Sequence, residues 1–184
     1  MKSPVKRTAV VLMLMALVGV TGFAQAKSLP VSANKTVVDG VVNSAEYSYA
    51  QEFGPLTLYA NRSNETLNLA VVGSTTGWVA VGLGSLKMNG STIFMGFVGA
   101  DGKPQFKPLA GQGHRHIDDK GAADTIVSYQ IKEANGKTTL EIALKAADYI
   151  KSGQSTLDMI FAVGDDKSFT PYHSFRGSVS LKVS

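Results

Sequence analysis

The sequence predicts an all-β domain, an antiparallel two-sheet β-sandwich of the immunoglobulin-like kind with at most one short helix. Apolar and polar residues alternate with a period of two along much of the chain, for example over residues 56–60 and 67–71, and this period is typical of strands with one buried face. The runs are short and eight or so in number, which favours two packed sheets. Turn-forming pairs separate them, and Asn135-Gly136 is a strong hairpin signal because a type I′ turn needs positive φ at both positions.

The expected elements follow in chain order. Residues 78–83 and 92–98 are apolar on both faces, which predicts central or doubly covered strands. Residues 145–151 are the one expected helix. Residues 103–123, rich in Gly, Pro and His, are predicted to form a long irregular loop, and a loop of about 20 residues is usually functional or mobile. Further strands are expected at 125–131, 138–144, 157–163 and 177–183.

The first 26 residues have the composition of a signal peptide. Three basic residues lie within the first seven positions, an apolar run of 12 residues follows over 9–20, and Ala24-Gln25-Ala26 matches the small-x-small pattern of a cleavage site. The alternative is a buried N-terminal helix, whereas a membrane-spanning helix would need about 20 apolar residues. The sequence therefore predicts a cleaved signal peptide over 1–26 and one domain over 27–184. The mature chain is expected to have no integral membrane anchor and to be periplasmic or secreted.

Cysteine content and charge exclude several classes of protein. The chain has no cysteine, which excludes disulfides, Fe–S clusters and the covalent attachment of c-type haem. Three of the 18 basic residues and none of the 14 acidic ones lie before residue 27, which leaves a net charge of +1 and argues against nucleic-acid binding. The G-x-S-x-G, H-E-x-x-H and P-loop motifs are absent, so we do not expect an enzyme.

Two residues are candidate ligands for a metal or a haem iron. If the last strand extends back to His173, this residue shares the apolar face of Phe175 and Val179, and a neutral imidazole in an apolar interior suits metal ligation. The alternative is a core histidine that is hydrogen-bonded to a carbonyl. Met88 lies in a polar turn between two apolar strands, where its soft thioether is compatible with haem iron or copper. The alternative is a methionine that packs over the end of a sheet.

A third candidate site is the segment His114-Arg115-His116, which is followed by Asp118 and Asp119. These residue types resemble a cluster of divalent-metal ligands. The alternative is a solvated loop, and no third ligand is fixed by the spacing. Trp78 is expected to pack in the core.

Several segments of the chain resemble the signature of DOMON domains. The similarity extends from Val37 to Val183 and depends on the order and spacing of the segments rather than on one strict motif. The segments are Gly77–Gly84, Met88–Ile93, Gly96–Val98, Asn135–Ile142, Phe161–Asp166 and Tyr172–Gly177. Ser91-Thr92 departs from the pattern, in which an acidic residue often follows the small one.

The resemblance implies a β-sandwich that binds haem b or, in other branches of the family, a sugar. Haem-binding members, such as the cytochrome domain of cellobiose dehydrogenase, use a Met from the turn after the G-W-x-x-x-G strand and a late His. These roles fall on Met88 and His173, which would be the cofactor-binding residues and axial iron ligands of a non-covalent haem b. The implied function is electron transfer with a redox protein or a membrane cytochrome as partner. The alternative is a non-enzymatic module that binds a sugar or another small ligand, with Tyr47, Tyr49, Tyr59 and Trp78 as candidate aromatic platforms.

Overall fold

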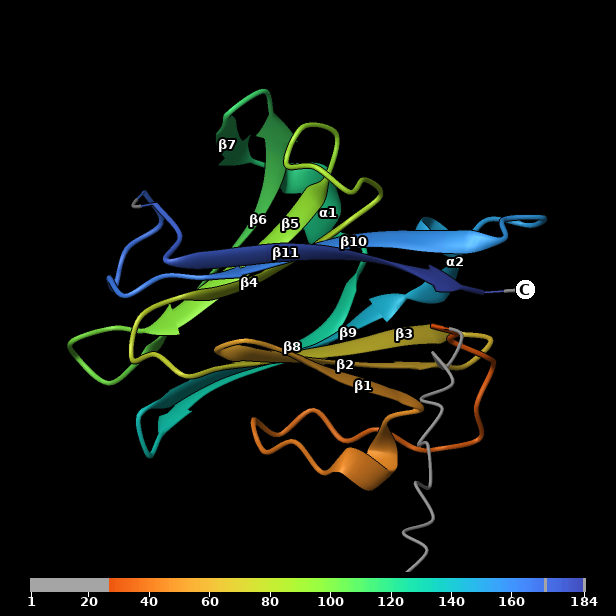
Figure 1. The fold of residues 1–184 in the computed structure, drawn as a ribbon, viewed down its shortest axis with the longest axis horizontal. Helices are drawn as coiled ribbons and strands as arrows, with labels where there is room; N and C mark the ends of the chain where they lie inside the picture. The colour runs from red at the N-terminus through yellow and green to blue at the C-terminus, as the bar shows by residue number, and fades with distance from the viewer. Residues whose placement is uncertain (1–26, 171, 184) are drawn as a thin grey trace, which may run out of the picture.

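The computed structural model describes residues 27–170 and 172–183. The predicted signal peptide lies outside these residues. The described chain forms two antiparallel sheets packed face to face, which confirms the predicted sandwich (Figure 1). One sheet has five strands in the order β1-β2-β3-β9-β8, and the other has six in the order β11-β10-β4-β5-β6-β7.

The elements are short, as the sequence predicts. None of the described helices is long and apolar enough to cross a membrane. The strands are β1 (Tyr49–Phe53), β2 (Leu56–Arg62), β3 (Thr66–Gly73), β4 (Val79–Leu83), β5 (Thr92–Val98), β6 (Pro104–Gln112), β7 (Arg115–Asp118), β8 (Ile126–Ala134), β9 (Lys137–Lys145), β10 (Thr156–Val163) and β11 (Phe175–Lys182); the helices are the 3-10 turn η1 (Ser44–Glu46), α1 (Lys120–Ala123) and α2 (Ala146–Tyr149).

The main core lies between the two sheets and is built from the alternate residues that face inward. Leu58, Val71 and Leu140 pair side by side across β2, β3 and β9, and all three are fully buried. They face Phe94 and Phe161 of the six-stranded sheet within one apolar cluster. A fully buried side chain of this size contributes about 1.5–3 kcal/mol, so the sandwich is held chiefly by this layer.

The six-stranded sheet is apolar on both faces. Its central strands β4 and β5 contribute inward residues to the main core, and their outward residues belong to a second cluster that includes Trp78, Ala80, Ile93 and Met95. The prediction of central or doubly covered strands is confirmed in its first form, because β4 and β5 lie at the centre of this sheet. This outer face carries the candidate site.

The predicted loop over residues 103–123 is wrong, because this stretch forms β6, β7 and α1. Two prolines and several glycines hide the strand period there. The carbonyl of Pro108 accepts a hydrogen bond from Asp119 N (3.0 Å), and the N and O of one strand residue point to the same side. The nitrogen of Pro108, which has no hydrogen to donate, therefore points toward Asp119, past the last residue of β7. No hydrogen bond between the two strands is lost there. The prediction of at most one short helix is also wrong, because this stretch forms α1 in addition to the expected α2.

Candidate functional site

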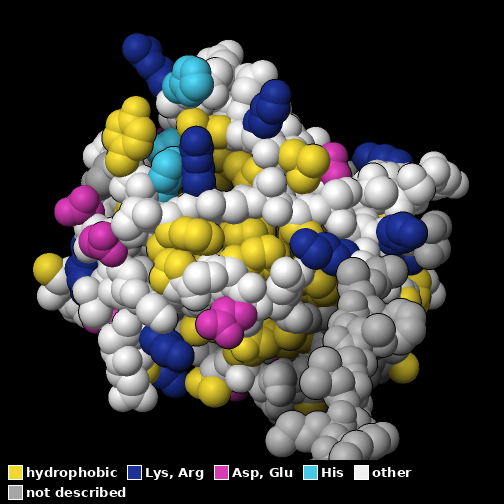
Figure 2. Space-filling view, viewed as in Figure 1, with side chains coloured by type: hydrophobic (Ala, Val, Ile, Leu, Met, Phe, Trp, Pro, Cys, Tyr) yellow, Lys and Arg dark blue, Asp and Glu magenta, His cyan; other side chains and the backbone are white. Residues whose placement is uncertain are grey.

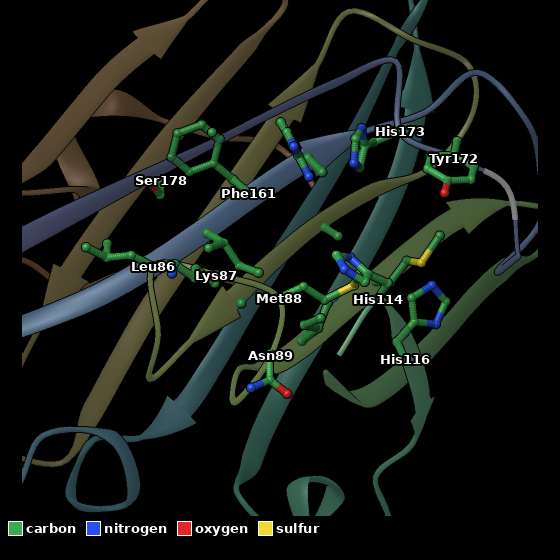
Figure 3. Close-up of a pocket in the computed structure, with 18 of the residues that line it drawn as sticks. Leu86, Lys87, Met88, Asn89, His114, His116, Phe161, Tyr172, His173 and Ser178 are labelled. Atoms are coloured by element: carbon green, nitrogen blue, oxygen red, sulfur yellow. The ribbon is translucent and has the colours of Figure 1, made fainter. Parts of the chain in front are cut away.

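A cavity of about 750 Å³ lies on the outer face of the six-stranded sheet. This volume is within the usual range for cofactor and small-ligand pockets. The floor is formed by outward residues of neighbouring strands, and the walls are formed by the β4–β5 loop, the β6–β7 hairpin and the segment before β11 (Figure 3).

The floor is apolar and has small residues at its centre. Ala80 of β4 lies beside Ala162 of β10, and Gly82 lies beside Ile160. A Cβ atom at Gly82 would come within 2.6 Å of the Ile160 side chain, so a larger residue there would have to displace a neighbour. The small residues leave an open, shallow surface between the walls.

Met88 lies on the wall formed by the β4–β5 loop, and this loop is fixed against β6. Gly90 N donates to Gly111 O (3.0 Å), and Gly111 N donates to Ser91 O (2.8 Å). The Ser91 hydroxyl also donates to Lys87 O (2.6 Å). A Cβ atom at Gly111 would overlap the Met88 carbonyl at 1.7 Å, so the close approach of the two segments requires glycine. The half-buried Met88 thioether is thereby held on a rigid wall that lines the cavity.

His173 lies on the opposite wall, in the segment before β11 (Figure 3). The expectation that His173 shares the apolar face of the last strand depends on a strand that extends back to it, and this condition is not met, because β11 begins at Phe175. Ser174 N donates to Val163 O (2.8 Å), and its hydroxyl reaches Asp165 Oδ1 (3.3 Å). The chain is anchored at Ser174, and His173 lines the cavity on the outer face instead of entering the core.

The β6–β7 hairpin brings His114 and His116 to the same cavity. The neighbouring acids serve other groups: Asp118 pairs with Lys107 (3.1 Å), and Asp119 Oδ1 caps α1 by accepting from Ala122 N (3.1 Å). No group of three His, Cys, Asp or Glu suited to a metal ion occurs in residues 27–170 and 172–183. The metal cluster considered for this segment is therefore not formed there, and its two histidines face the Met88–His173 cavity.

The charged side chains that line the cavity are cationic. Lys87 and Arg176 are at its edge, and no Asp or Glu is among the described lining residues. Figure 2 shows histidine and Lys or Arg side chains around an apolar area in the upper part of the molecule. Such a site favours an anionic or partly anionic ligand over a cation.

The tyrosines considered as sugar platforms do not serve this cavity. Tyr47 and Tyr49 are buried in or against the five-stranded sheet, and burial raises the pKa of Tyr49 to about 12. Tyr59 is on the same sheet, 5.5 Å from the ring of Tyr47. Trp78 lines the cavity but is 95 % buried, because its indole packs on Gly164, where a Cβ would come within 2.2 Å. It belongs to the outer cluster and not to the main core.

Sequence reasoning missed part of the lining. The exposed ring of Tyr172 and the guanidinium of Arg176 lie at the cavity edge. In the sequence both look like ordinary solvent-facing residues of an alternating segment, so the pattern does not mark them as part of a site. The small floor residues Ala80, Gly82 and Ala162 do have a signal. They occupy outward positions in or beside strands that the sequence predicts, from apolar residues on both faces, to be central or doubly covered.

The sequence matches no family model and no curated protein, whereas several solved structures share the fold. The cytochrome domain of Myriococcum thermophilum cellobiose dehydrogenase is similar with a TM-score of 0.54 at 11% identity, over 74% of this chain and 81% of that one. The cytochrome b domain of pyranose dehydrogenase from Coprinopsis cinerea gives 0.51 at 13% identity, over 69% and 76%. A family 9 carbohydrate-binding module from Caldicellulosiruptor kristjanssonii, in complex with glucose, gives 0.53 at 10% identity, over 86% and 96%. The chain therefore has a DOMON-like β-sandwich fold, as the cytochrome domains do.

Proposed function

We propose that this protein is an exported electron-transfer domain that binds haem b non-covalently, with Met88 and His173 as axial iron ligands. The observation that carries the proposal is that these two residues, 85 positions apart in the sequence, lie on two walls of one apolar cavity. A thioether and a neutral imidazole are the ligand pair of many electron-transfer haems.

The residues of the cavity fit a haem in three respects. The donor set is uncharged and nitrogen- and sulfur-based, which suits haem iron better than Ca²⁺ or Mg²⁺. The floor offers a shallow apolar surface with small residues at Ala80, Gly82 and Ala162. The cationic edge at Lys87 and Arg176 complements the carboxylates that a haem b carries, because paired charges offset part of their desolvation.

A bound haem would supply a one-electron couple between ferric and ferrous iron. The part of this chain is to hold the macrocycle on the apolar floor, to exclude water from it and to present Met88 and His173 from fixed backbone. If Met88 and His173 both held the iron, no position would remain open for oxygen, which would favour electron transfer over oxygen chemistry. The thioether of Met88 would stabilise the ferrous state and raise the potential relative to two imidazoles.

The same proposal includes location and partner. The signal-like residues 1–26 favour a periplasmic or secreted protein. Its partner would be a redox protein or a membrane cytochrome that docks through a small, transient interface. The solved cytochrome domains with the same fold support this assignment as relatives in fold only.

A second candidate function is the binding of a sugar. It is favoured by the carbohydrate-binding module in complex with glucose and by Tyr172, whose 89 % exposed ring stands at the cavity edge. Aromatic rings of this kind provide platforms for sugar rings. The apolar floor and the two ligand side chains give a sugar little to bind, so we place this function second.

Titration of the purified protein with haem, followed by absorption spectroscopy, tests the proposal. The wild type is expected to bind one haem and to give a low-spin spectrum. The variants Met88→Ala and His173→Ala are each expected to change it, whereas Met159→Leu, in the main core, should not. An unchanged spectrum in both cavity variants would refute the ligand assignment. A colourless protein whose melting temperature rises with oligosaccharide and not with haem would favour the sugar function.

A further inference from the structure

We infer that His114 is a reserve axial ligand, whose imidazole takes the position opposite His173 when Met88 does not bind the iron. The inference depends on the proposed haem function and goes beyond it, because it assigns a role to the β6–β7 hairpin. It predicts that loss of the sulfur ligand changes the electronic character of the haem without opening an iron coordination position.

The backbone holds His114 next to Met88. Gly113 N donates to Asn89 Oδ1 (2.8 Å), so the residue before His114 is bonded to the residue after Met88. Two further bonds, between Gly90 and Gly111 and between Gly111 and Ser91, join the same two segments. The site that a Cβ of Gly111 would occupy is only 3.2 Å from Met88 Cγ. The hairpin and the Met88 loop therefore form one wall.

The side chains of this wall face the same space. Met88 and His114 both line the cavity, and Figure 3 shows the two residues on one side of it and His173 on the other. No hydrogen bond of the three cavity imidazoles to another protein group occurs among residues 27–170 and 172–183; His114 is exposed to solvent, and His116 and His173 are half-buried. A neutral imidazole without a competing partner keeps a lone pair for a metal.

Two other donors are less suited to this position. His116 of β7 is two residues further along the hairpin and pairs with Gly111 of β6, whereas His114 directly follows Gly113, whose N–H is bonded to Asn89 beside Met88. Met95 is on the central strand β5 and is 98 % buried in the floor, so it is part of the surface on which the macrocycle would rest. His114 is the donor that shares the wall with Met88.

The exchange of ligands has a physical basis. Imidazole is a harder donor than a thioether and is preferred by the more highly charged ferric iron, whereas sulfur favours ferrous iron. Since the two donors share a rigid wall, substitution of one by the other needs rotation of side chains rather than refolding of the loop. The haem with two imidazole ligands is expected to have the lower reduction potential.

The test compares four full-length proteins loaded with haem: wild type, Met88→Ala, Met88→Ala/His114→Ala and Met88→Ala/His116→Ala. Electron paramagnetic resonance of the ferric state and potentiometry are the measurements. Met88→Ala is expected to remain low-spin with the signature of two imidazoles and a lower potential. The variant that also lacks His114 is expected to become high-spin, whereas the variant that also lacks His116 should behave like Met88→Ala. Circular dichroism and thermal unfolding of the haem-free proteins check that all four fold.

The outcomes separate this inference from the proposed function. If Met88→Ala is high-spin although His114 is present, or if Met88→Ala/His114→Ala stays low-spin, the reserve role of His114 is wrong while the haem assignment stands. If the wild type binds no haem, or if its spectrum is unchanged by His173→Ala and by Met88→Ala, the proposed function itself fails.

Discussion

The outer faces of the two sheets differ in what lies over them. The outer face of the five-stranded sheet is covered by the N-terminal segment that includes η1, which Figure 1 shows beneath β1 and β2. Fully buried Glu141 joins that segment to the sheet, because it accepts hydrogen bonds from Asp39 N (3.1 Å), Gly40 N (2.6 Å) and Tyr47 Oη (2.7 Å). Within residues 27–170 and 172–183, no segment covers the outer face of the six-stranded sheet over β4 and β10 in this way, and this face carries the cavity.

The difference separates stability from binding. On the covered face, a buried carboxylate has a donor for both of its oxygens, so its burial is compensated and the network is costly to break. On the open face, the floor is apolar and the nitrogen and sulfur donors on the walls have no partner within the described chain. We therefore expect substitutions on the first face to change folding and substitutions on the second to change ligand binding.

The largest effect is expected for Glu141→Ala. The change leaves the buried N–H of Gly40, the part-buried N–H of Asp39 and the Tyr47 phenol without an acceptor, and the free energy of unfolding should fall on the order of 3 kcal/mol. The folded fraction should bind haem as the wild type does. Urea unfolding measures the first quantity and haem titration the second. Glu133→Ala is the matched control, because Glu133 forms a single surface ion pair with Lys167 (2.6 Å), which is worth at most about 1 kcal/mol. Similar losses in both variants would contradict the account.

The next effect is expected for Ala162→Leu, which adds bulk to the centre of the cavity floor. Ala162 lies outside the main core and is half-buried, so the free energy of unfolding should change by less than about 1 kcal/mol. The affinity for haem should fall by about tenfold or more, since about 1.4 kcal/mol of lost contact has that effect. The control is Ala147→Leu on the exposed surface of α2. Equal haem affinity in the two variants would show that the floor is not the binding surface.

The smallest effect is expected for Tyr47→Phe. Burial first, and then the hydrogen bond to Glu141, raise the pKa of the Tyr47 phenol well above its ordinary value. In the unfolded chain this phenol loses its proton near pH 10, so the contribution of Tyr47 to wild-type stability should be constant below about pH 10 and fall as pH rises further. Tyr47→Phe should cost about 1 kcal/mol at neutral pH and show a weaker alkaline loss. Urea midpoints between pH 7 and 11 test this.

The control for the alkaline effect is Tyr172→Phe, since the ring of Tyr172 is 89 % exposed. It should reproduce the wild-type profile over the same range. If Tyr47→Phe loses stability above about pH 10 as steeply as the wild type, Tyr47 is not a source of the alkaline effect.

The sequence was informative wherever one rule governs a segment. The doubly apolar strands β4 and β5 and the hairpin at Asn135-Gly136, with φ of 54° and 73°, follow from periodicity and turn chemistry. Strand β6 could not be found in this way. A proline normally argues against a paired strand, and Pro108 is accommodated because β7 ends before the residue to which its N–H would have to donate. The orientation of His173 was missed because it depends on Ser174, whose partners Val163 and Asp165 are distant in sequence. The placement of His114 and Met88 on one wall likewise depends on contacts between segments that are distant in sequence, such as the hydrogen bond from Gly113 N to Asn89 Oδ1.

The central claim is that the sulfur of Met88 binds a haem iron opposite His173. The most direct measurement is the nuclear magnetic resonance spectrum of the haem-loaded ferrous protein with isotopically labelled methionine methyl groups. Beyond residue 26 the chain has Met88, Met95 and Met159 as its methionines. The account predicts one methyl resonance shifted far outside the ordinary range by the haem ring, absent in Met88→Leu. A spectrum in which every methionine methyl keeps its ordinary position after haem is bound would contradict it.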